Sequence, residues 1–103
     1  MKKDNVIKKK SFDFAVSVVN LYKHLTKEKK EYVMSKQLLR SGTSVGANIE
    51  EAIGGQSDKD FLHKFSIAYK EARESMYWLK LLHATDYLTQ KEFESLSKNI
   101  DEI

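Results

Sequence analysis

The sequence predicts an all-α protein, an antiparallel up-down-up-down four-helix bundle, and three observations support this fold class. Apolar residues recur at spacings of three and four along the chain, and no segment sustains the alternation typical of a strand. The 103 residues include no proline, so nothing forces a helix to break. Connections of about three to six residues separate four segments, and such short connections join antiparallel neighbours. We expect one domain, residues 1–103.

The first helix is expected at about residues 11–28, after a basic N-terminal arm at residues 1–10. Ser11 is placed to cap this helix, because a serine side chain can accept a hydrogen bond from the first turn. Two apolar stripes lie side by side on it, one from positions 14 to 25 and one from positions 12 to 22. Together they make a face wider than contact with a single helix requires.

The second helix is expected at residues 31–53. Its apolar period passes through two glycines without a break, and Gly54-Gly55 then ends it, with one of these glycines free to take a left-handed conformation.

The third and fourth helices are each preceded by a capping signal. Ser57, three residues before Asp60, resembles a capping box and opens a helix at residues 58–84. The stretch Thr89-Gln90-Lys91-Glu92 is a clearer capping box and opens a shorter helix at residues 89–102.

Gly42 and Gly46 form a Gly-x-x-x-Gly pattern that has two interpretations. A phosphate-binding loop would follow a strand, and its Walker form places Lys-Ser/Thr after the second glycine, where this chain has Ala47-Asn48. We therefore interpret the glycines as helical positions that another helix, from the same chain or a neighbouring subunit, approaches closely. They are candidates for an oligomer interface. Three aromatic residues are further candidates, with a place in the core as their alternative: Tyr69, Tyr77 and Trp78.

A polar stripe runs along the second helix at spacings of four and three. We expect its members to form a partly buried hydrogen-bonded network with an acid of the third helix: Gln37, Ser41, Ser44, Asn48 and Glu51, with Glu74. A carboxylate metal centre is the rival interpretation, but di-iron bundles need two Glu-x-x-His motifs, and this chain offers only Asp60 and His63. We therefore expect no metal, no cofactor and no catalytic residues.

The positive charge is concentrated in the first part of the chain. Residues 1–30 carry nine lysines and three acids, whereas residues 31–103 carry a net charge of −3. Clustered lysines can neutralise phosphates, and the alternative is that they are simply solvated. The candidates for nucleic-acid binding are Lys2, Lys3, Lys8, Lys9, Lys10, Lys27, Lys29, Lys30 and Arg40. No apolar run is long enough for a signal peptide or a membrane span, so we expect a cytoplasmic protein without a membrane partner.

The central half of the chain resembles the four-helix-bundle family of 23S rRNA intervening sequence proteins, also called S23. The resemblance begins at QLLRSGTSVGANIEEAIGG and continues through SDKDF to the Glu-rich stretch after IAYK. The family's pattern falls on Gln37, Leu38, Arg40, Ser41, Ser44, Val45, Asn48, Ile49, Glu51, Ser57, Asp60, Phe61, Ile67, Ala68 and Glu74. Many relatives read Asn-Ile-Ala-Glu-Gly where this chain has Asn48-Ile49-Glu50-Glu51-Ala52, so we transfer no contact to Ala52.

The resemblance implies a small bacterial protein that forms a homopentameric ring and has no established enzymatic activity. It also implies a relationship to the accessory proteins of diversity-generating retroelements, whose basic pentamer works with a reverse transcriptase and nucleic acid. We therefore expect a non-catalytic homo-oligomer that associates with RNA or DNA through basic surface residues. The alternative is a scaffold or adaptor ring that binds a protein partner and no nucleic acid.

Overall fold

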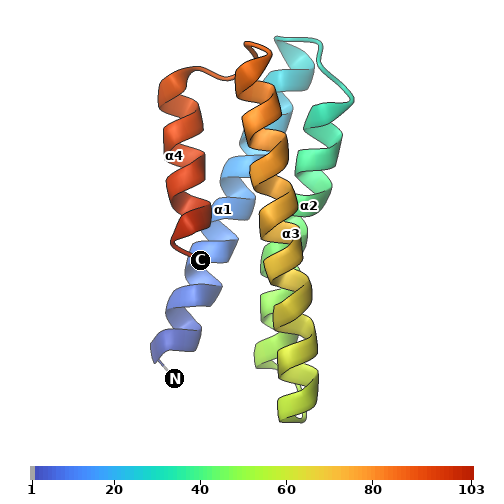
Figure 1. The fold of residues 1–103 in the computed structure, drawn as a ribbon, viewed down its shortest axis with the longest axis vertical. Coiled ribbons are helices and arrows are strands. Elements are labelled where there is room, and N and C mark those ends of the chain that lie inside the picture. The colour runs from blue at the N-terminus through green and yellow to red at the C-terminus, as the bar shows by residue number, and fades with distance from the viewer. Residues whose placement is uncertain (1) are drawn as a thin grey trace.

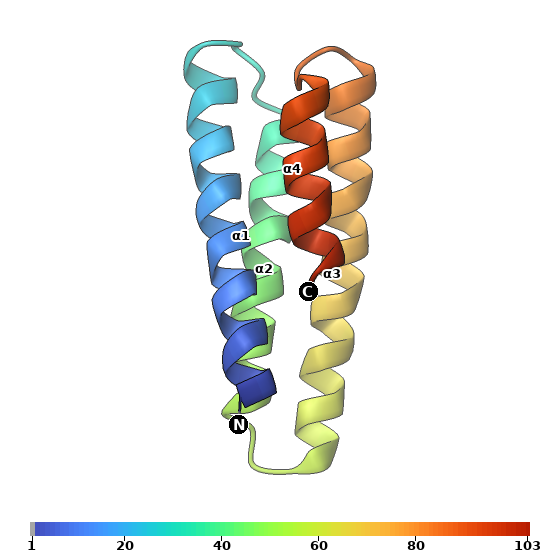
Figure 2. The ribbon, with the colours of Figure 1, turned by 90° about the vertical axis from the view of Figure 1, so that its left-hand side faces the viewer.

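The computed structural model describes the backbone of residues 2–103 and the side chains from Asn5 onward. The helices follow one another as α1 (Lys2–Lys27), α2 (Met34–Ile53), α3 (Asp58–Ala84) and α4 (Gln90–Asp101). The α1–α2 and α3–α4 connections lie at one end of the molecule and the α2–α3 connection at the other (Figure 1, Figure 2). Sequential helices are therefore antiparallel, and the predicted four-helix bundle is confirmed.

The fourth helix is much shorter than the third. α4 has 12 residues and α3 has 27, which corresponds to about 18 Å against about 40 Å of helix. The C-terminus consequently lies near mid-height of the bundle, and only α1, α2 and α3 continue beyond it (Figure 1, Figure 2). The bundle has a four-helix half and a three-helix half.

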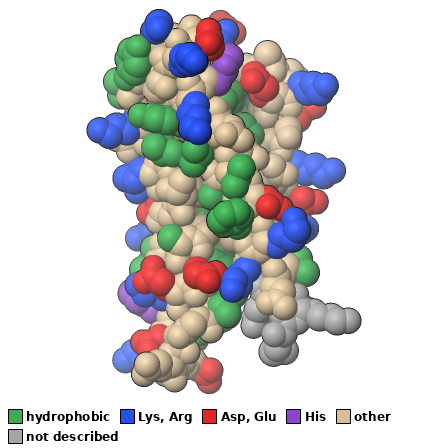
Figure 3. Space-filling model, turned by 180° about the vertical axis from the view of Figure 1, so that it is seen from behind, with side chains coloured by type: hydrophobic (Ala, Val, Ile, Leu, Met, Phe, Trp, Pro, Cys, Tyr) green, Lys and Arg blue, Asp and Glu red, His purple; other side chains and the backbone are tan. Residues whose placement is uncertain are grey.

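The helices turn their apolar faces inward, as the spacing of apolar residues predicts. On the face that Figure 3 shows, charged side chains are scattered over the helices, with hydrophobic side chains among them. The most exposed large hydrophobic side chains include Phe12 at 68%, Leu62 at 66% and Tyr69 at 60%. No helix in the part of the chain that the structure describes has the length and apolar character needed to cross a membrane.

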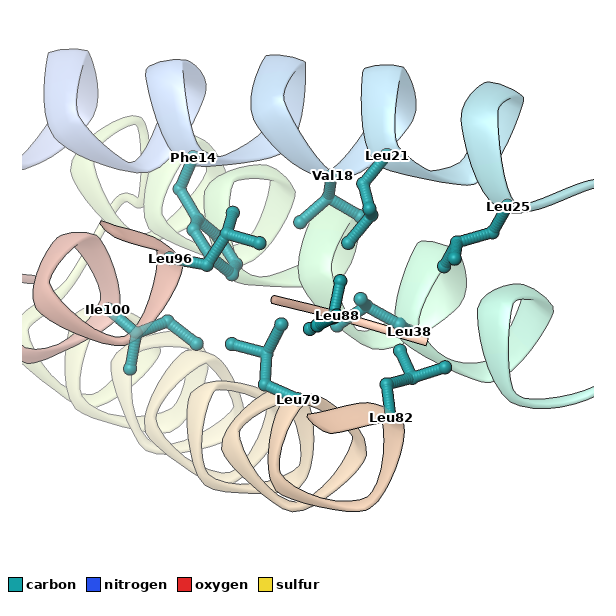
Figure 4. Packing of buried hydrophobic residues seen from close by; sticks show 10 residues of the cluster. All are labelled: Phe14, Val18, Leu21, Leu25, Leu38, Leu79, Leu82, Leu88, Leu96 and Ile100. Carbon is teal, nitrogen blue, oxygen red and sulfur yellow. The ribbon is translucent and has the colours of Figure 1, made fainter. Parts of the chain in front are cut away.

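Each half of the bundle has its own hydrophobic core cluster. In the four-helix half, side chains from all four helices and from the α3–α4 connection meet (Figure 4): Phe14, Val18, Leu21, Leu25, Leu38, Leu79, Leu82, Leu88, Leu96 and Ile100. In the three-helix half the cluster is smaller, and it consists of Val45, Ile49 and Ala68 with partly buried neighbours such as Ile7. Burial of apolar surface therefore favours the four-helix half.

The prediction of a basic N-terminal arm before the first helix is wrong, because α1 begins at Lys2 and residues 2–10 are helical. Ser11 is not a cap. It is 1% exposed inside the helix, where its hydroxyl donates to the Lys8 carbonyl at 3.1 Å. The reason is that Ile7 continues the apolar period of Phe14 and packs against the smaller core cluster. This contact extends the helix through the lysines.

The second helix begins at Met34, three residues later than expected. Lys30 takes a left-handed conformation with φ of 56°, which turns the chain between α1 and α2. Glu31, expected as the first residue of the helix, lies before it. Its buried carboxylate accepts backbone hydrogen bonds from Val33, Met34 and Ser35 at 3.1, 3.1 and 2.7 Å.

The other helix ends agree more closely with expectation. α3 has the predicted bounds, and the Ser57 hydroxyl accepts from the Asp60 amide at 3.1 Å. α4 begins one residue later and ends one residue earlier than predicted, and the capping box of Thr89 and Glu92 is present. Gly54 ends α2, but with φ of −81°, and none of the described glycines has a positive φ. The prediction that Gly54 or Gly55 takes a left-handed conformation is therefore wrong.

Candidate nucleic-acid interface

Seven lysines gather at the end of the bundle where α1 meets α2 and α3 meets α4. Three of them, Lys27, Lys29 and Lys30, were predicted from the sequence as nucleic-acid contacts, and all are exposed. The topology adds residues from near the ends of α1 and α3 and the starts of α2 and α4. We call this set the basic end: Lys23, Lys27, Lys29, Lys30, Lys36, Lys80 and Lys91.

The lysines of the basic end lie outside the ion pairs that the structure describes. Among the described residues, no ion pair involves any of these seven ammonium groups. Of the four acids in residues 23–36 and 80–92, Glu31 and Glu92 direct a carboxylate oxygen at backbone N–H groups. Seven lysines against four acids leave these two segments with a net charge of +3. An unpaired array of this kind attracts polyanions.

The N-terminal lysines lie far from the basic end and are partly neutralised. Lys8 pairs with Glu50 at 3.4 Å, and Lys9 pairs with Asp13 at 2.8 Å. Lys10 is half-buried. The side chains of Lys2 and Lys3 lie outside the described residues.

Arg40 is held between two acids of α3. Its guanidinium donates to Glu71 at 3.1 Å and to Glu74, and the Trp78 indole N–H also donates to Glu74, at 2.9 Å. The hydrogen bond from Trp78, followed by that from Arg40, holds the pKa of Glu74 below its ordinary value. The hydrogen bond to Glu74 likewise raises the pKa of Arg40. Arg40 therefore joins α2 to α3 and is not a free phosphate ligand, contrary to the sequence-based prediction.

If the protein binds RNA, replacing Arg40 with glutamine is expected to leave the affinity within about twofold of the wild type, since the guanidinium is already neutralised by two carboxylates. The free energy of unfolding should fall by about 1 kcal/mol or less, because the half-exposed ion pair is screened by solvent. Fluorescence anisotropy with labelled RNA and urea unfolding measure the two quantities. A tenfold loss of affinity would instead identify Arg40 as a phosphate contact.

The predicted polar network exists in three separate parts. The Ser75 hydroxyl donates to Ser41 at 2.9 Å, and both side chains are fully buried between α2 and α3. The Asn48 amide donates to the backbone and hydroxyl oxygens of Ser44 at 2.9 Å, and Glu74 bonds to the α2 arginine described above. Ser41, Ser44, Asn48 and Glu74 are thus hydrogen-bonded.

Gln37 and Glu51, the two ends of the predicted polar stripe, are exposed. Glu51 pairs with Lys64 at 3.1 Å. A stripe with a seven-residue repeat shifts by about 20° per heptad on a straight helix, which turns Glu51 away from the core. Gln37 lies beside exposed Lys36 near the start of α2. The prediction of a buried network is wrong for these two residues.

The two helical glycines contact their own chain. A Cβ at Gly42 would lie 2.9 Å from Cγ2 of Val18, and one at Gly46 would lie 3.3 Å from the backbone oxygen of Ser11. Both glycines therefore allow α1 to approach α2, and their assignment to an oligomer interface is wrong.

The aromatic interface candidates divide into two groups. Trp78 is half-buried and packs on the larger core cluster. Tyr69 and Tyr77 are 60% and 57% exposed and remain available to a partner. Arg73 lies over the Tyr69 ring at 5.9 Å from its centroid.

An apolar hollow of about 380 Å³ lies where α4 ends, and we call it the α2–α3 hollow. Val45 and Ile49 of α2, Ala68 and Ala72 of α3, and Ile103 contribute to its lining. Among the residues that the structure describes, no group of three or more His, Asp or Glu side chains is arranged to hold a metal ion.

Fold and surface together define a small all-α bundle with a lysine-rich end. The model of the 23S rRNA-intervening sequence protein family matches residues 3–103. The chain belongs to this family.

A solved relative supports the same assignment. The crystal structure of a protein of unknown function from the S23 ribosomal protein family of Bacteroides thetaiotaomicron VPI-5482 is 58% identical in sequence. The alignment covers 97% of this chain and 89% of that chain, with a TM-score of 0.95. A search of curated proteins gives no match.

Proposed function

We propose that this protein is a non-catalytic homo-oligomer that associates with RNA through the basic end. The observation that carries the proposal is the set of seven lysines without ion-pair partners among the described residues. Lysines that neutralise phosphates release counterions, which supplies affinity without reading a base sequence. The family is named after 23S rRNA intervening sequences, and an RNA partner agrees with this name.

Homo-oligomerisation is the second part of the proposal. A ring of copies would repeat the basic end several times and would increase its affinity for a long polyanion. Exposed Phe12, Leu62, Tyr69 and Tyr77 offer apolar area for contacts between copies. The pentamer implied by the family resemblance is the expected assembly, and the mass of the native complex measures it.

The same exposed aromatic residues favour a second candidate, a ring that binds a protein partner and no nucleic acid. In that case the lysines serve solubility alone. The two candidates differ in whether RNA affinity depends on particular lysines.

Changing Lys29 and Lys30 to glutamine is expected to lower RNA affinity about tenfold at moderate salt, since two phosphate contacts are lost. The slope of log affinity against log salt should become shallower by about 1.4 for single-stranded RNA. The measurement is fluorescence anisotropy with a labelled RNA over a series of salt concentrations.

The matched control changes exposed Lys59 and Lys70 of α3 to glutamine, with the same loss of charge outside the basic end. Its affinity should stay within about twofold of the wild type, because long-range charge alone is screened by salt. Equal losses in the two variants would contradict a localised interface. RNA affinity that does not change with salt would contradict phosphate binding altogether.

A further inference from the structure

A second feature of the surface is a groove between α1 and α4. Two hollows of about 450 and 320 Å³ lie along it. On α1 the lining residues fall at positions 6, 9, 10, 13, 17, 20, 21 and 24, on α4 at positions 91, 92, 95, 96 and 99, and just after α4 at position 102. Residues three and four apart share a helix face, so both hollows belong to one seam along α4. We call this seam the α1/α4 groove.

The middle of the groove is lined by neutral hydrogen-bonding groups. Ser17 and Asn20 of α1 face Ser95 of α4 across the larger hollow, and its lining also includes Leu21 and Leu96. Both leucines belong to the core, at 8% and 7% exposure. The side-chain hydrogen bonds that the structure describes include none from these two serines or from Asn20. The hydroxyls and the amide are therefore available to a ligand.

Positive charge lies at both ends of the groove. Lys91 lines the larger hollow, and Lys27 follows His24 three residues later on the same face of α1. Lys9 and Lys10 line the smaller hollow. The distance from Lys9 to Lys27 along α1 is about 27 Å at the rise of an α-helix. The groove thus connects the N-terminal lysines with the basic end.

Most of the carboxylates that line the groove already take part in an ion pair or a hydrogen bond. Asp13 pairs with Lys9 at 2.8 Å, and Glu92 accepts the Thr89 amide at 2.8 Å. Glu102 lines the far end of the smaller hollow. The middle and the Lys91 end therefore carry the stronger attraction for an anion.

We propose that the α1/α4 groove binds a single-stranded RNA, with phosphates at Lys27 and Lys91 and at Lys10. Ribose hydroxyls and base edges would meet Ser17, Asn20 and Ser95, and base faces would cover the apolar edges of Leu21 and Leu96. A single strand exposes its base faces and Watson–Crick edges, whereas a duplex keeps the faces stacked and the Watson–Crick edges paired. This inference rests on the proposed RNA association and extends its site from the basic end along the groove.

The test uses a fluorescein-labelled octamer of uridine and the full-length protein. Ser95→Phe fills the groove at an exposed position of α4. The affinity of this variant for the octamer should fall at least about tenfold, because the phenyl ring occupies the space that the bases need. Ser66→Phe, at an exposed position of α3, makes the same change elsewhere and should bind like the wild type. Circular dichroism melts establish that both variants fold.

Cross-linking locates the strand without any substitution. An octamer of 4-thiouridine irradiated on the wild-type protein should cross-link to peptides of α1 and α4. Octamer binding with cross-links elsewhere, or an unchanged Ser95→Phe affinity, would overturn the groove but leave RNA association intact. A preference for double-stranded RNA would also overturn it. Failure of the wild type to bind any RNA would overturn the proposed function as well.

Discussion

Replacing Gly42 with leucine is expected to lower the free energy of unfolding by about 3 kcal/mol, because the side chain has no room between α1 and α2. Even a Cβ at this position would lie 2.9 and 3.0 Å from the two methyl groups of Val18. Val18 is 0% exposed and belongs to the larger core cluster, so it has little space into which to move. The gain in helix propensity over glycine, about 1 kcal/mol, offsets only part of the clash. Urea unfolding followed by circular dichroism measures the difference.

Two further variants separate overpacking from a general effect of leucine in α2. Ala47→Leu, at an exposed position of the same helix, should change stability by about 0.5 kcal/mol or less. Val18→Ala should recover part of the loss when it is combined with Gly42→Leu, because it frees the volume that leucine needs. Full stability of Gly42→Leu alone would show that the glycine is not required for close approach of the helices.

The helical register could be predicted because burial follows the apolar period. Leu38, Val45 and Ile49 lie at spacings that place them on one face of a helix, and they are 1% exposed or less. Ser75 stands seven residues after Ala68 and four residues before Leu79, which puts it on the same face of a helix, and it is fully buried. Local spacing is sufficient here because each helix buries one continuous stripe.

The sequence could not predict which helix packs against each apolar stripe. The Gly-x-x-x-Gly pattern indicated a close approach, but the sequence left open which helix approaches Gly42. Two glycines are equally suited to a contact within a chain or between chains, and only the fold places Val18 opposite. The same limit applies to Trp78, because its packing on the larger core cluster depends on which helices lie beside α3.

The start of α1 shows a different limit. The lysines of residues 1–10 suggested a solvated arm, since charge runs are common outside regular structure. Ile7 carried the missing signal, because it stands seven residues before Phe14 and so lies near the same face of a helix. A single apolar residue among lysines is weak evidence from sequence, whereas its contact with the smaller core cluster is decisive in the fold.

The candidate interface is predictable only in part. Lys27, Lys29 and Lys30 are adjacent in sequence and were found there. Lys80 and Lys91 belong to other helices, and only the antiparallel topology brings them to the same end of the bundle. Sequence spacing likewise cannot tell that Arg40 is held by two carboxylates of α3.

Glu31→Ala is expected to lower the free energy of unfolding by about 3 kcal/mol, the second large effect. Its carboxylate is 7% exposed and accepts three backbone N–H groups at the start of α2. Alanine leaves these donors without a partner in a region that water reaches poorly, and each unsatisfied buried donor costs about 1–3 kcal/mol. A loss of 0.5 kcal/mol or less in urea unfolding would mean that water replaces the carboxylate.

The variant Glu31→Gln isolates the charge, and its effect should depend on pH. Burial alone would raise the pKa of Glu31, but the hydrogen bonds from Ser35, Met34 and Val33 outweigh it and lower the pKa below its ordinary value of 4.5. A carboxyl whose pKa is lowered by folding stabilises the protein above its unfolded-state pKa, and this contribution is lost as the pH falls through the folded-state pKa. The wild type should therefore exceed Glu31→Gln by about 1–2 kcal/mol at neutral pH. This difference in the free energy of unfolding should shrink below pH 4.5. The other acids titrate alike in both proteins and do not change the difference. A difference that is constant with pH would therefore exclude the charge of Glu31 as its cause.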